Sequence, residues 1–111
     1  MITQELIEVL GLKVLSNFEH RDVNGVFISD MLSDVMAGAQ SGNLWITVQT
    51  HKNIVPAANL VDVSAVIITN GKTVPLETIE LANKHNVAIL STEYTTFELV
   101  GRLYSLGLAT K

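Results

Sequence analysis

The stretch that decides the fold runs from residue 65 to residue 92 and reads AVIITNGKTVPLETIELANKHNVAILST. It opens with a continuously apolar run, residues 65–68, and closes with a second one, residues 87–90, as expected for strands that are covered on both faces. Between them lies a helical pattern with Pro75 at the first helical position and Glu77 near the positive end of the helix dipole. A strand, a helix and a second strand predict a right-handed parallel βαβ unit.

The same alternation continues on both sides of this unit. Apolar runs at residues 26–28 and 44–48 each end in a polar cluster and lead into a helix-like segment. Shorter patterns predict a helix over residues 3–10, a strand over 12–15 and a final helix from about 96 to 106. The sequence therefore predicts a three-layer α/β/α fold, with a mainly parallel or mixed sheet of four to six strands.

Helix starts and core positions follow from local chemistry. We expect Thr3, Ser29 or Asp30, Asn53 and Thr95 to cap helices, with Glu98 completing a capping box at Thr95. Trp45 and Phe97 are expected in the core, whereas Tyr94 and Tyr104, which have polar tips, suit an interface or a pocket edge.

Size and composition limit the function. The 111 residues fit a single domain, 1–111, and the absence of cysteine excludes disulfides, thiolate metal sites and cysteine nucleophiles. A net charge of −4 with scattered basic residues argues against nucleic-acid binding. Charged residues make up 16% of the chain, against about 25% in ordinary domains, which favours self-association or docking on a partner. The start lacks signal-peptide features and no apolar stretch is long enough for a bilayer, so we expect a cytoplasmic protein with no membrane partner.

The polar clusters that follow the strands are the candidate ligand site. In open α/β sheets, ligands bind beyond the carboxyl ends of the strands, where backbone amides and helix N-termini converge. The candidate residues are Ser29, Asp30, Gln49, Thr50, His51, Asn53, Thr69, Asn70, Gly71, Ser91 and Thr92. We call this edge the rim.

Several motifs have competing interpretations. Gly71-Lys72-Thr73 looks like the end of a phosphate-binding P-loop, but the glycine required five residues earlier is Val66, so a tight turn is favoured. The loop 49–53 is either an anion cradle or an ordinary polar connection. Asp30 and Asp34 are expected to cap and solvate a helix rather than bind a metal, and the histidines show no ligand spacing.

Catalytic patterns are weak. Ser29 or Ser91 would need a positioned base such as His51, and no Gly-x-Ser-x-Gly elbow is present. We therefore assign no catalytic residue and expect no enzyme activity, with a small hydrolase as the minor alternative.

The chain resembles the DRTGG domain, a small α/β module that occurs alone, between paired CBS domains in some pyrophosphatases and in some phosphotransacetylases. The resemblance runs from about residue 6 to residue 107. It is carried by Arg21, Val23 and Gly25 before Ser29-Asp30, then Gly42-Asn43-Leu44, Thr50 to Asn53, Thr69-Asn70-Gly71, and Leu90-Ser91-Thr92 before Phe97. His51-Lys52 stand where the family has Asp-Arg, and Asn70 replaces a glycine, which asparagine can do because it tolerates left-handed backbone angles.

The resemblance implies a fold similar to the N-terminal domain of HPr kinase/phosphorylase, without its kinase activity, and a non-catalytic regulatory module that is typically dimeric. Our leading hypothesis is a homodimer that binds a small anionic ligand at the rim, such as an adenine nucleotide or another phosphate. The alternative is a ligand-free scaffold that docks on a larger enzyme such as a redox complex.

Overall fold

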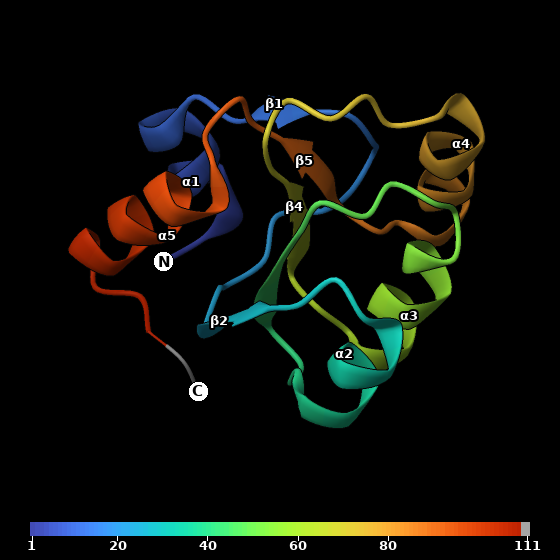
Figure 1. The fold of residues 1–111 in the computed structure, drawn as a ribbon, viewed down its shortest axis with the longest axis horizontal. Coiled ribbons are helices and arrows are strands. Elements are labelled where there is room, and N and C mark those ends of the chain that lie inside the picture. Colours follow the sequence, from blue (N-terminus) through green and yellow to red (C-terminus); the bar gives the residue numbers. More distant parts are fainter. Residues whose placement is uncertain (110–111) are drawn as a thin grey trace.

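The computed structural model describes residues 1–109 and contains one five-stranded sheet between two layers of helices (Figure 1). The strands are β1 (Lys13–Val14), β2 (Gly25–Ile28), β3 (Asn43–Thr47), β4 (Ala65–Ile68) and β5 (Ile89–Ser91). The helices are α1 (Thr3–Leu10), α2 (Leu32–Gly38), α3 (Ile54–Val61), α4 (Leu76–His85) and α5 (Thr96–Ser105). The predicted fold class is therefore confirmed.

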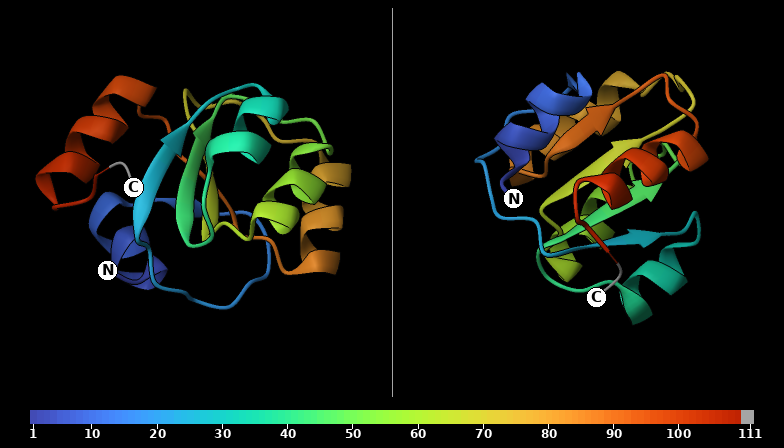
Figure 2. Two further views of the ribbon diagram at one scale, coloured as in Figure 1. Left: turned by 90° about the horizontal axis from the view of Figure 1, so that it is seen from below. Right: turned by 90° about the vertical axis from the view of Figure 1, so that its left-hand side faces the viewer.

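The sheet order is β1-β5-β4-β3-β2, in which β2 to β5 run parallel and β1 pairs antiparallel with β5. Successive parallel strands are direct neighbours, each joined to the next by one helix. Because such crossovers are right-handed and the order advances in one direction, α2, α3 and α4 all lie on the same face. The other face is covered by α1 and α5, from opposite ends of the chain (Figures 1 and 2).

Each face of the sheet has its own apolar core, because side chains alternate along a strand. Leu44, Ile46 and Ile67 pack with the leucines of α1 and α5. Trp45 and Val66 point the other way and pack against α2, α3 and α4. Trp45 is fully buried, as predicted, and its indole N–H donates to the carbonyl of Ser29 at 2.8 Å.

Two predicted N-cap residues are wrong because their polar side chains have other partners, although α1 spans residues 3–10 as predicted. Thr3 lies inside α1 and is buried, where its hydroxyl accepts the N–H of Arg21 at 3.1 Å. Neither Ser29 nor Asp30 caps α2, since Met31 is the residue at its N-cap position. Ser29 Oγ instead accepts the N–H of Met31, and the Asp30 carboxylate accepts the hydroxyl of Thr47 in β3.

Two other helix starts differ from the prediction in detail. Asn53 occupies the predicted N-cap position of α3, but its side chain makes no capping bond. Pro75 is the N-cap residue of α4 rather than its first residue. The cap predicted for α5 is confirmed, because Thr95 Oγ1 accepts the N–H of Glu98 at 3.2 Å. The predicted capping box is not completed, because the Glu98 carboxylate accepts from the Arg102 guanidinium at 3.1 Å instead.

The prediction that Phe97 lies in the core is wrong, since its side chain is 89% exposed. Leu99 and Leu103 are the buried residues of α5. At 100° per residue, Phe97 lies on the opposite side of the helix from them. Within residues 1–109, none of the helices has both the length and the apolar character needed to cross a bilayer.

Candidate functional site

The rim exists as a physical edge of the sheet. The parallel registers pair Ile28 with Ile46, Thr47 with Ile68, and Ile68 with Ser91, so the strand ends follow one another in a row. The sheet-like hydrogen bonding continues one residue further, because the N–H of Thr92 donates to the carbonyl of Ile68 at 3.0 Å. The polar residues after successive strands therefore lie along one side of the molecule.

At the β2 end of the rim, the polar groups bind one another. The Asp30 carboxylate accepts the hydroxyl of Thr47 at 2.8 Å and the N–H of Val48 at 3.0 Å. The Ser29 hydroxyl donates to Asp34 at 3.2 Å. These contacts tie the start of α2 to the end of β3, which is a structural role for Ser29 and Asp30.

The loop 49–53 is tied to α4 and to itself. The carbonyl of Thr50 accepts the hydroxyl of Thr78 at 2.8 Å, and Lys52 lies 3.9 Å from Glu77. The N–H of Asn53 donates to Nδ1 of the exposed His51 at 3.1 Å. These contacts favour the ordinary polar connection over the anion cradle at this loop.

The Thr69-Asn70-Gly71 segment is a structural turn. Thr69 is fully buried and its hydroxyl lies 2.8 Å from that of Thr96. Asn70 and Gly71 both adopt left-handed angles, with φ of 63° and 62°, as expected for an asparagine in place of a glycine. Their N–H groups donate to the carbonyls of Tyr94 and Thr92. These two amides therefore join two loops and do not face a ligand.

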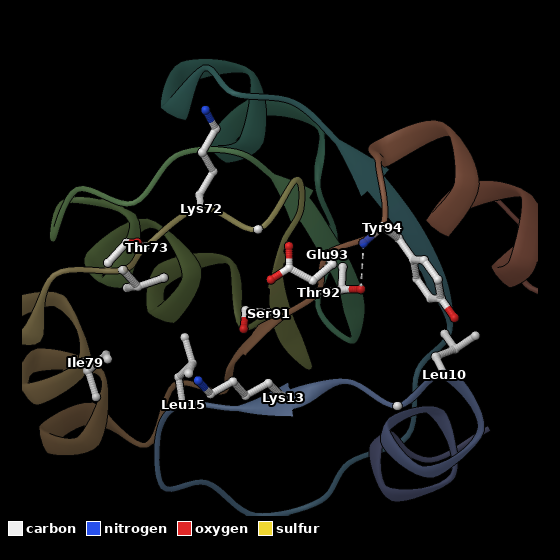
Figure 3. Close-up of a pocket in the computed structure, with 13 residues that line it drawn as sticks. Leu10, Lys13, Leu15, Lys72, Thr73, Ile79, Ser91, Thr92, Glu93 and Tyr94 are labelled. Atoms are coloured by element: carbon white, nitrogen blue, oxygen red, sulfur yellow. Dashed lines mark hydrogen bonds between the residues drawn. The ribbon is translucent and has the colours of Figure 1, made fainter.

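The open part of the rim is a cavity of about 710 Å³ at its β5 end (Figure 3). We call it the β1–β5 cavity. It is lined by Leu10, Gly11, Lys13, Leu15, Gly71, Lys72, Thr73, Val74, Ile79, Ser91, Thr92, Glu93 and Tyr94. Of the eleven candidate residues, it takes in only Gly71, Ser91 and Thr92.

The charged residues of the cavity were not selected from the sequence. Lys13 reaches it because β1 pairs antiparallel with β5, in a register that places Lys13 opposite Ser91. Lys72 and Thr73 belong to the motif that resembles the end of a P-loop, and this was the one local signal available. The antiparallel pairing joins distant parts of the chain, and no local pattern predicted it.

The cavity is polar in the middle and apolar at its ends. Figure 3 shows the Glu93 carboxylate pointing toward the centre with Ser91 beside it, while Lys72 extends outward. The Glu93 carboxylate lies against Gly71, in space that any β-carbon at position 71 would occupy. Leu10 and Tyr94 form one end, and Leu15 and Ile79 the other (Figure 3). Two lysines and one glutamate give the lining a small positive excess.

Residues 1–109 were also considered for a metal site and for a catalytic serine–histidine pair. Within residues 1–109 there is no group of three or more histidine and carboxylate side chains placed to hold a metal ion. Ser29 and His51, considered as nucleophile and base, are bonded to Asp34 and to the Asn53 amide respectively. These contacts give the hydrolase alternative no support.

Comparisons with known proteins agree with the fold. The profile of the DRTGG domain family matches residues 5–106. A comparison with curated protein sequences finds no match. Among solved structures, the chain is similar to the CBS and DRTGG domains of the regulatory region of Clostridium perfringens pyrophosphatase, complexed with the activator diadenosine tetraphosphate.

That similarity has a TM-score of 0.71 and 22% sequence identity, and it covers 96% of this chain and 47% of the other. At 22% identity, this similarity shows that the two proteins share a fold, and it shows nothing further about this chain. The chain thus spans less than half of a regulatory region that also contains CBS domains.

Proposed function

Because the chain belongs to the DRTGG domain family, we propose that it is a non-catalytic regulatory module that binds a small anionic ligand in the β1–β5 cavity. The observation that carries this proposal is the pair Lys13 and Lys72 at an open cavity at the strand ends, where neither lysine has an ion-pair partner among residues 1–109. Hydroxyl groups of Thr73 and Ser91 lie on the same lining and can donate to an anion.

An adenine nucleotide is the first ligand to test. The cavity volume falls within the usual range for small-molecule sites, about 300–1,000 Å³. The Tyr94 ring and the apolar ends of the cavity can contact a base, while the lysines contact phosphate. The pyrophosphatase regulatory region, which has the same fold in its DRTGG part, is bound to a dinucleotide activator. This supports testing nucleotides on this chain.

Isothermal titration of the full chain with AMP, ATP, diadenosine tetraphosphate and inorganic phosphate tests the proposal. We expect saturable binding of at least one of them, weakened about tenfold by Lys13→Gln, the equivalent of roughly 1.4 kcal/mol. Glu93→Gln should instead tighten binding, because it removes a carboxylate that repels an anion. A cationic ligand would give the reverse pattern, with tighter binding to Lys13→Gln and weaker binding to Glu93→Gln.

Two control variants separate the cavity from the rest of the surface. Lys84→Gln removes an exposed lysine on α4, outside the cavity lining, and His51→Ala removes a rim side chain outside it. Both should bind with wild-type affinity. Flat titrations across the panel, or equal weakening by Lys13→Gln and Lys84→Gln, would contradict the proposal.

Self-association in a cytoplasmic setting completes the proposed function. A 16% charged fraction leaves apolar surface uncovered, and Phe97 and Tyr104 are 89% and 74% exposed. The same exposure favours a second candidate function, a scaffold that docks on a larger enzyme and binds no ligand. Purification from native extract tests it, because a stable larger assembly that does not respond to the nucleotide panel would favour the scaffold.

A further inference from the structure

The outward side of α5 carries two aromatic side chains, Phe97 and Tyr104, that the described residues leave uncovered. Leu99 and Leu103 face the sheet, so the outward residues are Phe97, Gly101, Tyr104 and Ser105. Exposure of 89% for Phe97 and 74% for Tyr104 is unusual, since aromatic rings gain most from burial. The right-hand view of Figure 2 looks onto this side, where α5 lies in front of the sheet. We call these residues the α5 face.

The α5 face carries both an apolar projection and an apolar groove. The projection is the ring of Phe97. The groove has a volume of about 340 Å³ and lies between β2 and α5, where Ile28, Val100, Tyr104 and Leu108 contribute to its lining. Phe97 and Tyr104 are seven residues apart, so they lie on the same side of the helix, about two turns from each other. A projection and a groove on one face can fill each other only between two molecules.

The α5 face is bordered by one negative and one positive side chain. Glu98 and Arg102 lie on the side of this face that is next to α1, and both side chains are about half exposed. The Arg102 guanidinium donates to the Glu98 carboxylate of the same chain at 3.1 Å. Their charges cancel, so two copies can approach without net repulsion. A partner of strong positive or negative charge would gain nothing from this neutral surface.

We propose that the α5 face is the homodimer interface, and that it packs antiparallel against the α5 face of a second copy across a two-fold axis near Gly101. A two-fold axis makes the same patch serve both subunits. It brings Phe97 next to Tyr104 of the partner subunit, at the mouth of the groove. On the other flank it brings Glu98 within reach of Arg102 of the partner subunit.

Gly101 lies at the crossing point of this arrangement. A β-carbon there would meet nothing within 4 Å, so the space in front of the helix is open. Glycine in the middle of a helix is destabilising relative to alanine, but it lets a second backbone approach closely. The inference deepens the self-association proposed above and does not depend on the ligand.

Sedimentation equilibrium of the full chain tests the proposal without ligand. We expect the wild type to have twice the mass of the 12.1 kDa chain, and Phe97→Glu to be monomeric with an unchanged circular dichroism spectrum. Leu76→Glu is the matched control, because Leu76 is 69% exposed on α4, on the opposite face of the sheet. This variant should remain dimeric.

A charge reversal tests the antiparallel arrangement itself. Glu98→Arg places like charges opposite each other in the dimer, and we expect the dimer to dissociate at least tenfold more readily. Arg102→Glu should do the same, and the double variant Glu98→Arg/Arg102→Glu should restore wild-type association.

A monomeric wild type, a Phe97→Glu variant that stays dimeric, or a double variant that remains weakened would each overturn the proposal. Ligand titration of Phe97→Glu keeps the two proposals separate, because the β1–β5 cavity does not include Phe97.

Discussion

At the scale of single residues, the contact between Arg21 and Asp62 shows how one charge joins distant parts of the chain. Arg21 donates to both carboxylate oxygens of Asp62, at 2.8 and 3.1 Å, and the Ser41 hydroxyl donates to the same carboxylate at 2.6 Å. Asp62 ends α3 in a left-handed conformation, with φ of 68°. The hydrogen bonds from Ser41 and then from Arg21 hold the pKa of Asp62 below its ordinary value of 3.8.

This lowered pKa predicts a pH dependence. A carboxyl group whose pKa falls on folding contributes stability above its unfolded pKa, and this contribution is lost as the pH falls through the folded pKa. Asp62→Asn keeps a side chain that tolerates the left-handed angle. We expect it to lower the free energy of unfolding near neutral pH by up to about 1 kcal/mol, because the pair is exposed to solvent.

Urea denaturation across a pH series measures this effect. The difference between the wild type and Asp62→Asn should shrink as the pH falls below 3.8. The control is Glu80→Gln, an exposed carboxylate on α4 without an ion pair among residues 1–109. A constant difference at every pH would show that the Asp62 charge does not stabilise the fold.

At the scale of elements, β1 depends on the buried residue that follows its end. The Ser16 hydroxyl donates to the carbonyl of Val87 at 2.7 Å and accepts the N–H of Ile89 at 2.8 Å, so it replaces two backbone partners where the ladder stops. Ser16→Ala leaves both backbone groups buried without a bond. We expect a loss of about 2 kcal/mol in the free energy of unfolding, and faster hydrogen exchange at residues 87–91.

The control for this prediction is Ser33→Ala, which removes an exposed hydroxyl on α2, away from both the cavity and the α5 face. This change should alter stability by less than about 0.5 kcal/mol. Because β1 also carries Lys13 to the β1–β5 cavity, Ser16→Ala should weaken ligand binding as well. Equal stability of the two serine variants would refute the role assigned to Ser16.

The same element marks the limit of prediction from the sequence. The four parallel strands and their helices were predictable, because each has a local apolar run followed by polar residues. The antiparallel pairing of β1 with β5 was not, since it depends on contacts between distant segments, and the cavity with Lys13 was missed for this reason. Asp30 failed as a predicted cap because Thr47, the last residue of β3, and Val48, which follows it, bind its carboxylate.

At the scale of the whole molecule, the proposed ligand cavity and the proposed dimer interface are linked by a contact between two side chains, Tyr94 in the cavity lining and Arg102 beside the α5 face. Residues 91–94 line the cavity and lead directly into α5 through the cap Thr95. The guanidinium of Arg102 lies 4.6 Å from the centre of the Tyr94 ring, within the range of a cation–π contact. A ligand that packs on Tyr94 therefore contacts the residue that positions Arg102 on the α5 face.

This connection predicts that ligand binding and dimerisation are coupled. A ligand that orders residues 91–94 should fix Tyr94 and Arg102, and so tighten the dimer by about fivefold or more. Because coupling is reciprocal, dimerisation should raise ligand affinity by the same factor. Sedimentation equilibrium with and without saturating ligand measures this factor.

The coupling should depend on the ring of Tyr94. Tyr94→Leu should abolish the coupling while the protein still dimerises, and Tyr94→Phe, which keeps the ring, should preserve the coupling. An identical dimer dissociation constant with and without bound ligand would show that the cavity and the α5 face act independently.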